Sequence, residues 1–219
     1  KMMWDDNRDK CATLGSIMHR NIELMYNDIP VTDESLEYKH HFMKFHQEQM
    51  DDGLEVFRTE WTLASLDLMI TGSIDMIYCR RDKVSGLISE FHMVDWKRSK
   101  KISKFSYGKN GKAPMDEIPD CNFFHYSLQL GLYSHILLKE YSVKIKTKRI
   151  LVFHPNNESY ECYHAKEMPE EIAEMLRARK RKGLVGKPGD LLKHIPPTVE
   201  QVKMAEANTE NMFRSVQVG

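Results

Sequence analysis

A chain of 219 residues with 41% hydrophobic and 29% charged residues has the composition of an ordinary folded protein with a sizeable core. The formal net charge is zero, which excludes a protein covered in nucleic acid but leaves room for a local basic groove. No apolar run is long enough to cross a bilayer and no signal peptide is visible, so we expect no membrane partner.

The cysteines are too far apart in the sequence to form a C-x-x-C pair, which argues against a zinc ribbon. We expect no iron–sulfur cluster either, and instead free buried thiols. Such thiols are typical of a reducing intracellular compartment, the cytoplasm or nucleus, in the host cell if the protein is viral. The four cysteines are Cys11, Cys79, Cys121 and Cys162.

Two helices are predicted near the start of the chain. Apolar residues recur at helical spacing over residues 13–27, where His19 and Glu23 lie four apart and therefore share a face. A second helix is predicted over residues 33–50. Adjacent histidines diverge on a helix, so we expect the histidines of this segment on the surface and not at a metal; they are His40, His41 and His46.

Three strands follow, with a change from helical to strand periodicity. They are rich in β-branched and aromatic residues and cover residues 54–63, 68–78 and 87–96. Short connections separate them, including a turn near residues 81–86. The sequence therefore predicts a three-stranded antiparallel meander.

The third strand ends in residues with clear chemical potential. Side chains alternate along a strand, so Asp95 and Lys97 point the same way and Trp96 points the other way. If the last two strands lie side by side, Asp75 can approach Asp95. Two carboxylates beside a lysine are costly unless a divalent cation lies among them, and Mg²⁺ takes oxygen ligands of this kind. A lone D-x-K pattern is more often a solvated strand edge, so this interpretation depends on the other motifs.

A loop dense in positive charge begins directly after Lys97. Its basic side chains could neutralise phosphates while the aromatic ones stack on bases, although a solvated loop is the alternative interpretation. The basic residues are Arg98, Lys100, Lys101, Lys104, Lys109 and Lys112, with Phe105 and Tyr107 between them.

The second half of the chain alternates helices and strands. Gln129 and Tyr133 lie four apart on one helix and are therefore neighbours. A later helix ends in basic residues 177–182, which suit the helix dipole and leave DNA binding or nuclear localisation as an option. The predicted elements are a helix over 122–140, a strand over 144–153, its hairpin partner over 160–164, a helix over 169–182, a loop over 183–197 and a polar helix over 198–213.

Four motifs occur in a characteristic order along this chain. They are G-x-x-x-H at Gly15 and His19, G-S-I-D at residues 72–75, D-W-K at residues 95–97, and Q-x-x-x-Y at Gln129 and Tyr133. Together they resemble the PD-(D/E)xK nuclease superfamily, within it the group related to the RecB nuclease domain and lambda exonuclease. The resemblance covers roughly residues 12–165.

The resemblance implies a fold and a division of the chain. The implied fold is α/β (α+β), a restriction-endonuclease-like core with a mixed central β-sheet flanked by helices. The nuclease domain would span residues 1–182, and residues 183–219 would form a loop and helical tail that can pack on the same domain.

The resemblance also implies roles for particular residues. His19, Asp75, Asp95 and the Trp96 carbonyl would hold one or two Mg²⁺ or Mn²⁺ ions. The catalytic residues would be Asp75, Asp95, Lys97, Gln129 and Tyr133. Contacts with nucleic acid would come from Lys100, Lys101, Lys104, Tyr107, Gln129 and Tyr133. Glu60 and Glu23 are candidates for acids just outside the ligand set.

The function implied is that of a metal-dependent deoxyribonuclease, with exonuclease activity preferred, in recombination, repair or viral genome processing. A metal-activated water would attack the phosphodiester of single- or double-stranded DNA and leave a 5′ phosphate. Because the chain begins at Lys1, a larger polypeptide with a helicase or primase domain is compatible with it. The alternatives are a nuclease-like module that binds nucleic acid without cleaving it, and a metal-dependent hydrolase of another substrate. All three of Asp75, Asp95 and Lys97 are present, which favours the enzyme.

Overall fold

The computed structural model describes residues 2–31 and 39–183, with side chains from residue 10 onward. Five strands form one mixed sheet in the order β1-β2-β3-β4-β5. Only β3 and β4 run parallel, and the other neighbours are antiparallel. The strands are β1 (Glu55–Ser65), β2 (Ile70–Arg81), β3 (Ile88–Arg98), β4 (Ile145–Phe153) and β5 (Glu161–His164).

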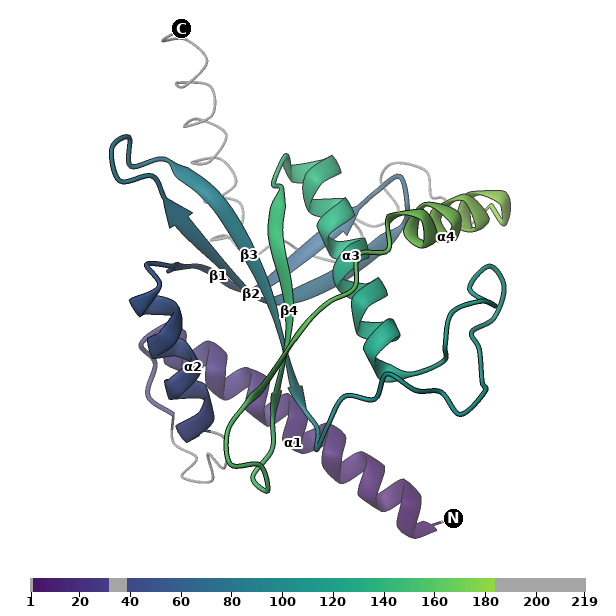
Figure 1. Cartoon of the computed structure of the whole chain (residues 1–219), viewed down its shortest axis with the longest axis horizontal. Coiled ribbons are helices and arrows are strands. Elements are labelled where there is room, and N and C mark those ends of the chain that lie inside the picture. The colour runs from purple at the N-terminus through teal and green to yellow at the C-terminus, as the bar shows by residue number, and fades with distance from the viewer. Residues whose placement is uncertain (1, 32–38, 184–219) are drawn as a thin grey trace, which may run out of the picture.

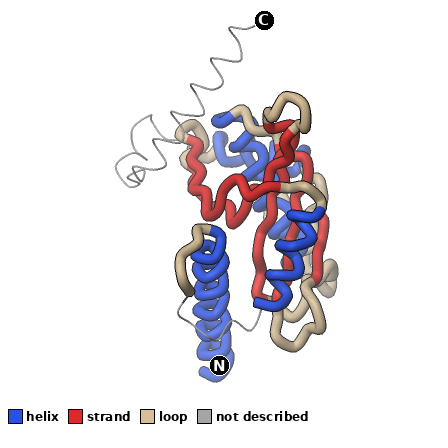
Figure 2. Tube along the Cα trace, turned by 90° about the vertical axis from the view of Figure 1, so that its left-hand side faces the viewer, coloured by secondary structure: helices blue, strands red, loops and turns tan. Residues whose placement is uncertain are grey.

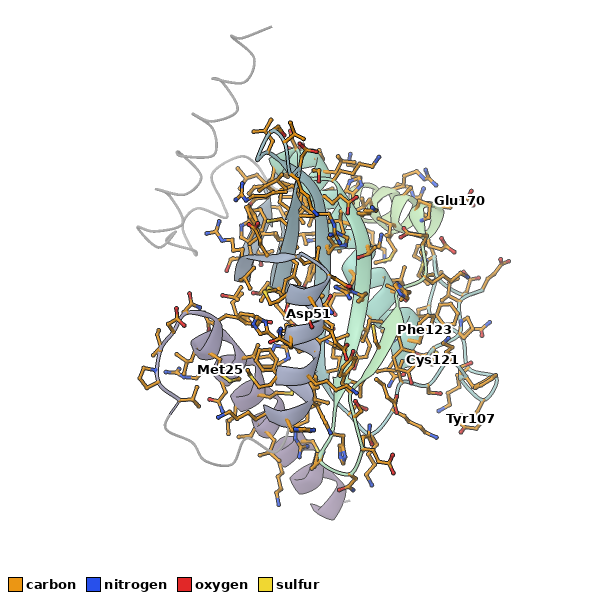
Figure 3. All side chains as sticks on the ribbon, turned by 60° about the vertical axis from the view of Figure 1, so that its left-hand side comes forward. Met25, Asp51, Tyr107, Cys121, Phe123 and Glu170 are labelled. Carbon is orange, nitrogen blue, oxygen red and sulfur yellow. The ribbon has the colours of Figure 1, made fainter. Side chains whose placement is uncertain are left out.

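Helices cover both faces of this sheet (Figure 1). The helices α1 (Met2–Tyr26) and α2 (Lys39–Asp51) lie on one side, and Figure 2 shows the long N-terminal helix beside the strands. The helices α3 (Asn122–Tyr141) and α4 (Pro169–Arg181) lie on the other. Met25 of α1 and Phe123 of α3 accordingly mark opposite sides of the sheet (Figure 3). The predicted mixed sheet flanked by helices is confirmed.

Each face of the sheet has its own apolar core. On the α3 side, Ile77 and Met93 are fully buried against the helix. On the α1 and α2 side, Trp96 is 1% exposed and packs edge to face on Phe42 and Phe45, with ring centroids 6.2 and 5.7 Å apart. Aromatic pairs of this geometry add to the energy of burial. Trp96 therefore fixes α2 on the end of β3.

The predicted meander β1-β2-β3 is confirmed, and its second turn shows why. Asp82 accepts backbone N–H bonds from Val84 and Ser85, at 3.1 and 2.8 Å, and so closes the turn with its side chain. Turns favour aspartate for this reason. At the other end of β2, the Arg179 guanidinium of α4 donates hydrogen bonds to the carbonyl oxygens of Leu68 and Met69. These bonds hold the β1–β2 turn.

Some sequence predictions were wrong in detail. The first helix begins at Met2 and not near residue 13. His41 is 6% exposed and His46 stacks on Phe42 with its Nδ1 3.3 Å from the Tyr26 hydroxyl, so neither is a simple surface residue. Their neighbours are aromatic, and burial of this kind depends on tertiary packing.

The side chain of the first residue of α3 binds the loop that follows β3. The N-cap of α3 is Cys121, without a side-chain cap, while the Asn122 amide oxygen accepts the Ser103 N–H at 2.7 Å. The start of the second helix and the tail over residues 184–219 lie outside the described residues. In the described part of the chain, no helix is both long and apolar enough to span a membrane.

Candidate metal centre

The sheet forks where β2 and β3 separate, and the candidate site lies in this fork. The β2–β3 ladder ends at the pair Met76 and Val94, while β3 continues beside β4 as far as Arg98. Beyond the last pair, the β1–β2 ribbon and the β3–β4 pair run apart (Figure 1). The backbone groups of Trp96 therefore have no β2 partner and need other ones.

Two side chains supply those partners. Asp75 Oδ2 accepts the Trp96 N–H at 2.7 Å, and His19 Nε2 lies 2.9 Å from the Trp96 carbonyl oxygen. A carbonyl only accepts, so the Nε2 nitrogen carries the proton in this arrangement. The pattern G-x-x-x-H thus places a helical histidine from α1 at the open edge of β3.

Glu60 completes a group of three potential metal ligands. His19 Nδ1 lies 3.5 Å from Asp75 Oδ1 and 3.6 Å from Glu60 Oε1. One ligand atom from each of the three lies within 4.8 Å of the others. Ser73 donates to the other oxygen of Glu60 at 3.1 Å and so orients this carboxylate.

The backbone at Glu60 is unusual for a strand. Its φ is 43°, in the left-handed region that side chains other than glycine rarely adopt. It lies between the ladder pairs of Thr59 and Trp61, so the β1–β2 ladder skips this residue within a continuous strand. Strain of this kind is concentrated at functional sites.

The charges at this point favour a cation. Burial lowers the pKa of His19, but hydrogen bonds with Asp75 and Glu60 outweigh it and raise the pKa to about 10. The imidazole is therefore protonated at neutral pH and supplies positive charge between two carboxylates. A divalent cation bound to the same oxygens would replace that proton.

Asp95 and Lys97 form a second unit beside this group. The Lys97 ammonium lies 2.6 Å from Asp95 Oδ2 and 4.8 Å from the centre of the Tyr126 ring on α3. Burial, and then the charge of Asp75, raise the pKa of Asp95 above its ordinary value. Burial lowers the pKa of Lys97, but Asp95 and Asp75 outweigh it and the net shift is upward.

The ligand set therefore differs in arrangement from the expected one. His19, Asp75 and the Trp96 carbonyl converge as expected, whereas the carboxylate of Asp95 is bonded to Lys97. Glu60, expected outside the set, lies as close to His19 as Asp75 does. The available signal was an acid directly before the apolar Trp61 of β1, but the positive φ of Glu60 is invisible in the sequence.

A hollow of about 580 Å³ opens beside Glu60 and His19. Glu23 lines it, and burial and the nearby Glu60 charge raise the pKa of this acid. A Cβ added at Gly15 would meet nothing within 4 Å, so this glycine leaves the hollow open. The other lining residues are Ser16, Arg20, Thr62 and Ser73, of which only Ser73 belongs to a motif singled out in the sequence.

Gln129 and Tyr133 are neighbours, as predicted. The Gln129 amide donates to the Tyr133 hydroxyl at 3.1 Å, and the Tyr133 ring lies on the backbone of Gly72. A Cβ at Gly72 would approach the Tyr133 Cζ to 2.7 Å, closer than real contacts allow. The pair therefore holds β2 against α3 three residues before Asp75.

The basic loop divides into two kinds of lysine. Lys100, Lys101 and Lys104 are all exposed, but the Lys104 ammonium also lies over the rings of Phe123 and Tyr163, at 4.8 and 5.8 Å from their centres. Lys104 therefore packs against the protein more than its sequence context indicates.

The basic end of α4 is also partly occupied. Arg177 and Arg181 both pair with Glu174, at 2.8 and 2.7 Å, and Arg179 binds backbone carbonyls. This end of the helix is therefore a weaker candidate for a DNA-binding surface than the loop that follows β3.

Comparison with models of known protein families and with curated proteins finds no match for this chain. The functional conclusion consequently depends on the geometry and chemistry of the site.

Proposed function

We propose that this protein is a metal-dependent deoxyribonuclease that hydrolyses phosphodiester bonds in DNA. The observation that carries the proposal is the fork of the sheet. There an imidazole and two carboxylates converge, the imidazole also contacts a backbone carbonyl, and the Asp75 charge acts on the neighbouring Asp95–Lys97 pair.

The donor set suits a divalent cation with mixed oxygen and nitrogen ligands. His19, Glu60, Asp75 and the Trp96 carbonyl would hold it, and Asp95 lies beside them. Oxygen donors suit Mg²⁺, and the imidazole makes Mn²⁺ at least as good a partner. When bound, such an ion lowers the pKa of a coordinated water and neutralises charge on phosphate oxygens.

The residues of the chain would then divide the remaining work. Lys97 holds an ammonium next to the donor set, where it can orient the attacking water and stabilise the negative charge that develops on the phosphate. Asp95 fixes that ammonium, because its carboxylate lies 2.6 Å away. The exposed lysines of the loop after β3 favour a polyanionic substrate, and among polyanions the resemblance favours DNA.

The test is incubation with linear and closed-circular DNA, each single- and double-stranded, in Mg²⁺, in Mn²⁺ and in EDTA. We expect cleavage that requires metal, and digestion of linear forms only if the enzyme is an exonuclease. Asp95→Asn, which preserves the shape beside Lys97, should reduce the rate at least about a hundredfold, because the charge that fixes the Lys97 ammonium is lost.

The matched control is Asp67→Asn, which removes a surface carboxylate that pairs with Lys139. It should retain the wild-type rate. Cleavage that persists in EDTA, or an Asp95→Asn variant with full activity, would refute the proposal.

A further inference from the structure

Two aromatic side chains stand almost fully in solvent in the loop that follows β3. Phe105 is 78% exposed and Tyr107 is 95% exposed. In the described part of the chain, they are the only aromatic residues among the large apolar side chains that are exposed. Figure 3 shows Tyr107 projecting beyond Cys121 and Phe123, at the outer edge of the molecule.

The loop that presents these rings is fixed at its base. Ile102 is buried in the core under α3, and the Ser103 N–H donates to the Asn122 side chain at 2.7 Å. Farther out, Gly111 N donates to Ile118 O and Asp120 N donates to Lys109 O, both at 2.9 Å. The backbone that carries the rings is thus held by hydrogen bonds on both sides of them in the sequence.

The turn that carries Tyr107 is strained in a way that burial does not explain. Tyr107 and Gly108 have φ values of 52° and 80°, and Lys109 N donates to Ser106 O at 3.1 Å. Positive φ at both central residues is typical of a type I′ turn, which favours asparagine and glycine over a bulky tyrosine. With so little of it buried, the Tyr107 ring gains nothing from the fold that offsets this strain.

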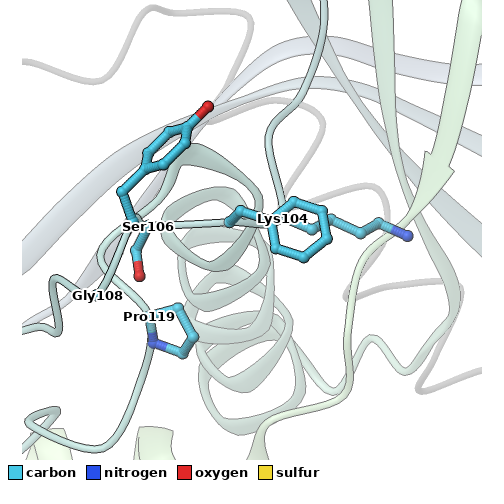
Figure 4. Close-up of a pocket in the computed structure, with 6 residues that line it drawn as sticks. Lys104, Ser106, Gly108 and Pro119 are labelled. Carbon is cyan, nitrogen blue, oxygen red and sulfur yellow. The ribbon is translucent and has the colours of Figure 1, made fainter.

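A hollow of about 360 Å³ lies between the rings and the returning arm of the loop (Figure 4). Its walls are mostly apolar and come from Lys104, Phe105, Ser106, Tyr107, Gly108 and Pro119. The Lys104 side chain extends away from Ser106 and Pro119 toward Phe123, so its charge is turned out of the hollow (Figure 4). The floor is therefore suited to a flat, uncharged ring, and exposed lysines flank it on both sides.

Flat rings joined by phosphates are the chemistry of single-stranded nucleic acid. In a duplex the base faces are already stacked on one another, and only their edges are open to a protein. In a single strand the faces are free, and aromatic side chains bind them with little sequence preference. The exposed Lys101 and Lys109 lie on either side of the rings in sequence, where they can reach the phosphates.

We propose that Phe105 and Tyr107 form a stacking platform for the bases of single-stranded DNA, and that an unpaired strand is the substrate presented to the metal centre. The inference rests on the proposed nuclease function and specifies its substrate. The loop begins where β3 ends at Arg98, one residue after Lys97, so the platform and the fork are joined by one short stretch of chain.

The experiment compares three fluorescently labelled probes by anisotropy in Ca²⁺, with the intact chain. The probes are a single-stranded oligonucleotide of about 12 nucleotides, an abasic strand of the same length, and the corresponding duplex. The wild type should bind the single strand at least about tenfold more tightly than the abasic strand, which has the phosphates but no bases. Phe105→Ala with Tyr107→Ala should reduce single-strand affinity to the abasic level and leave abasic binding unchanged.

Two further variants make the outcome specific. Phe105→Trp with Tyr107→Trp should restore binding, with quenching of the new tryptophan fluorescence by the bases. Val84→Ala with Leu87→Ala removes exposed apolar side chains from the distant β2–β3 turn and should change nothing.

Unchanged single-strand affinity in the double alanine variant, or an equal loss on the abasic strand, would overturn the platform. Cleavage of DNA in Mg²⁺ tests the nuclease separately. A protein that cleaves normally without the two rings refutes the platform alone, and a protein that stacks on single strands without ever cleaving them refutes the nuclease alone.

Discussion

His19 holds a proton that the fold itself stabilises, because two carboxylates face its ring. The pKa of His19 is raised from 6.5 to about 10 in the folded chain. The corresponding stability is fully present below the unfolded pKa and is lost as the pH rises through the folded pKa. Asp95, whose pKa is raised to about 7, contributes with the same sign at lower pH. The folding stability of the metal-free protein should therefore decrease as the pH rises into the alkaline range.

We expect the melting temperature in EDTA to fall by a few degrees between about pH 7 and pH 10. His19→Gln keeps a donor for the Trp96 carbonyl but cannot titrate, so its curve should be flatter over the same interval. Mn²⁺ should raise the melting temperature of the wild type most at the alkaline end, where no proton competes for the site. The control is His40→Gln on the surface of α2, and wild-type and His19→Gln curves of equal slope would contradict the assignment.

At the scale of elements, the site depends on how β2 is held while it leaves β3. Tyr133 on α3 lies against Gly72, and Gln129 fixes the Tyr133 hydroxyl. The glycine of G-S-I-D is thus required by a close contact with a helix on the far side of the sheet. A shift of β2 there would move Asp75, three residues later.

We predict that Gly72→Ala destabilises the protein by about 1–3 kcal/mol, the usual effect of overpacking. Gly72→Ala combined with Tyr133→Ala should be less destabilised than the sum of the two single changes, because the clash needs both partners. Gly15→Ala is the matched control: its Cβ has open space in α1, so it should stabilise by about 0.5–1 kcal/mol. Urea denaturation measures all four, and strictly additive effects would rule out the close approach of Tyr133 to Gly72.

The parts of this fold that the sequence could predict are those governed by local periodicity. The alternation through Asp95, Trp96 and Lys97 placed the tryptophan in one core and the charged pair on the other face, as the structure has them. The turn at Asp82 was equally local. Each of these depends on residues close together in the chain.

The parts that escaped prediction depend on tertiary contact. Nothing near Glu60 in the sequence reveals its positive φ, and nothing near Lys104 reveals that its ammonium lies over Phe123. Likewise, His41 is buried because α2 packs on the sheet, which helical spacing does not specify. The fork between β2 and β3 could not be predicted for the same reason, because it forms only when the β1–β2 ribbon and the β3–β4 pair are both in place.

At the scale of the whole molecule, positive and negative side chains balance, so any attraction for DNA must be local. The formal net charge is zero. The exposed lysines that follow Lys97 project from the same end of β3 as the metal centre, whereas the β2–β3 turn lies at the other end (Figure 1). A protein without net charge that contacts DNA through this basic loop should bind few phosphates, and its affinity should depend only modestly on salt.

This distribution predicts different effects for two pairs of lysines. Lys100→Ala with Lys101→Ala should weaken DNA binding in Ca²⁺ and flatten the plot of log affinity against log salt by roughly 0.7 for each phosphate that the variant no longer neutralises. The rate at saturating substrate should change much less, because the ligands in the fork are untouched. Lys104 is left in place, since its ammonium packs on Phe123 and its removal would disturb the loop. Lys83→Ala with Lys144→Ala removes the same charge from exposed positions at the far end of the strands, and its salt plot should superimpose on that of the wild type. If both pairs flatten the plot equally, the attraction is a property of total charge and the loop has no special part in holding the strand.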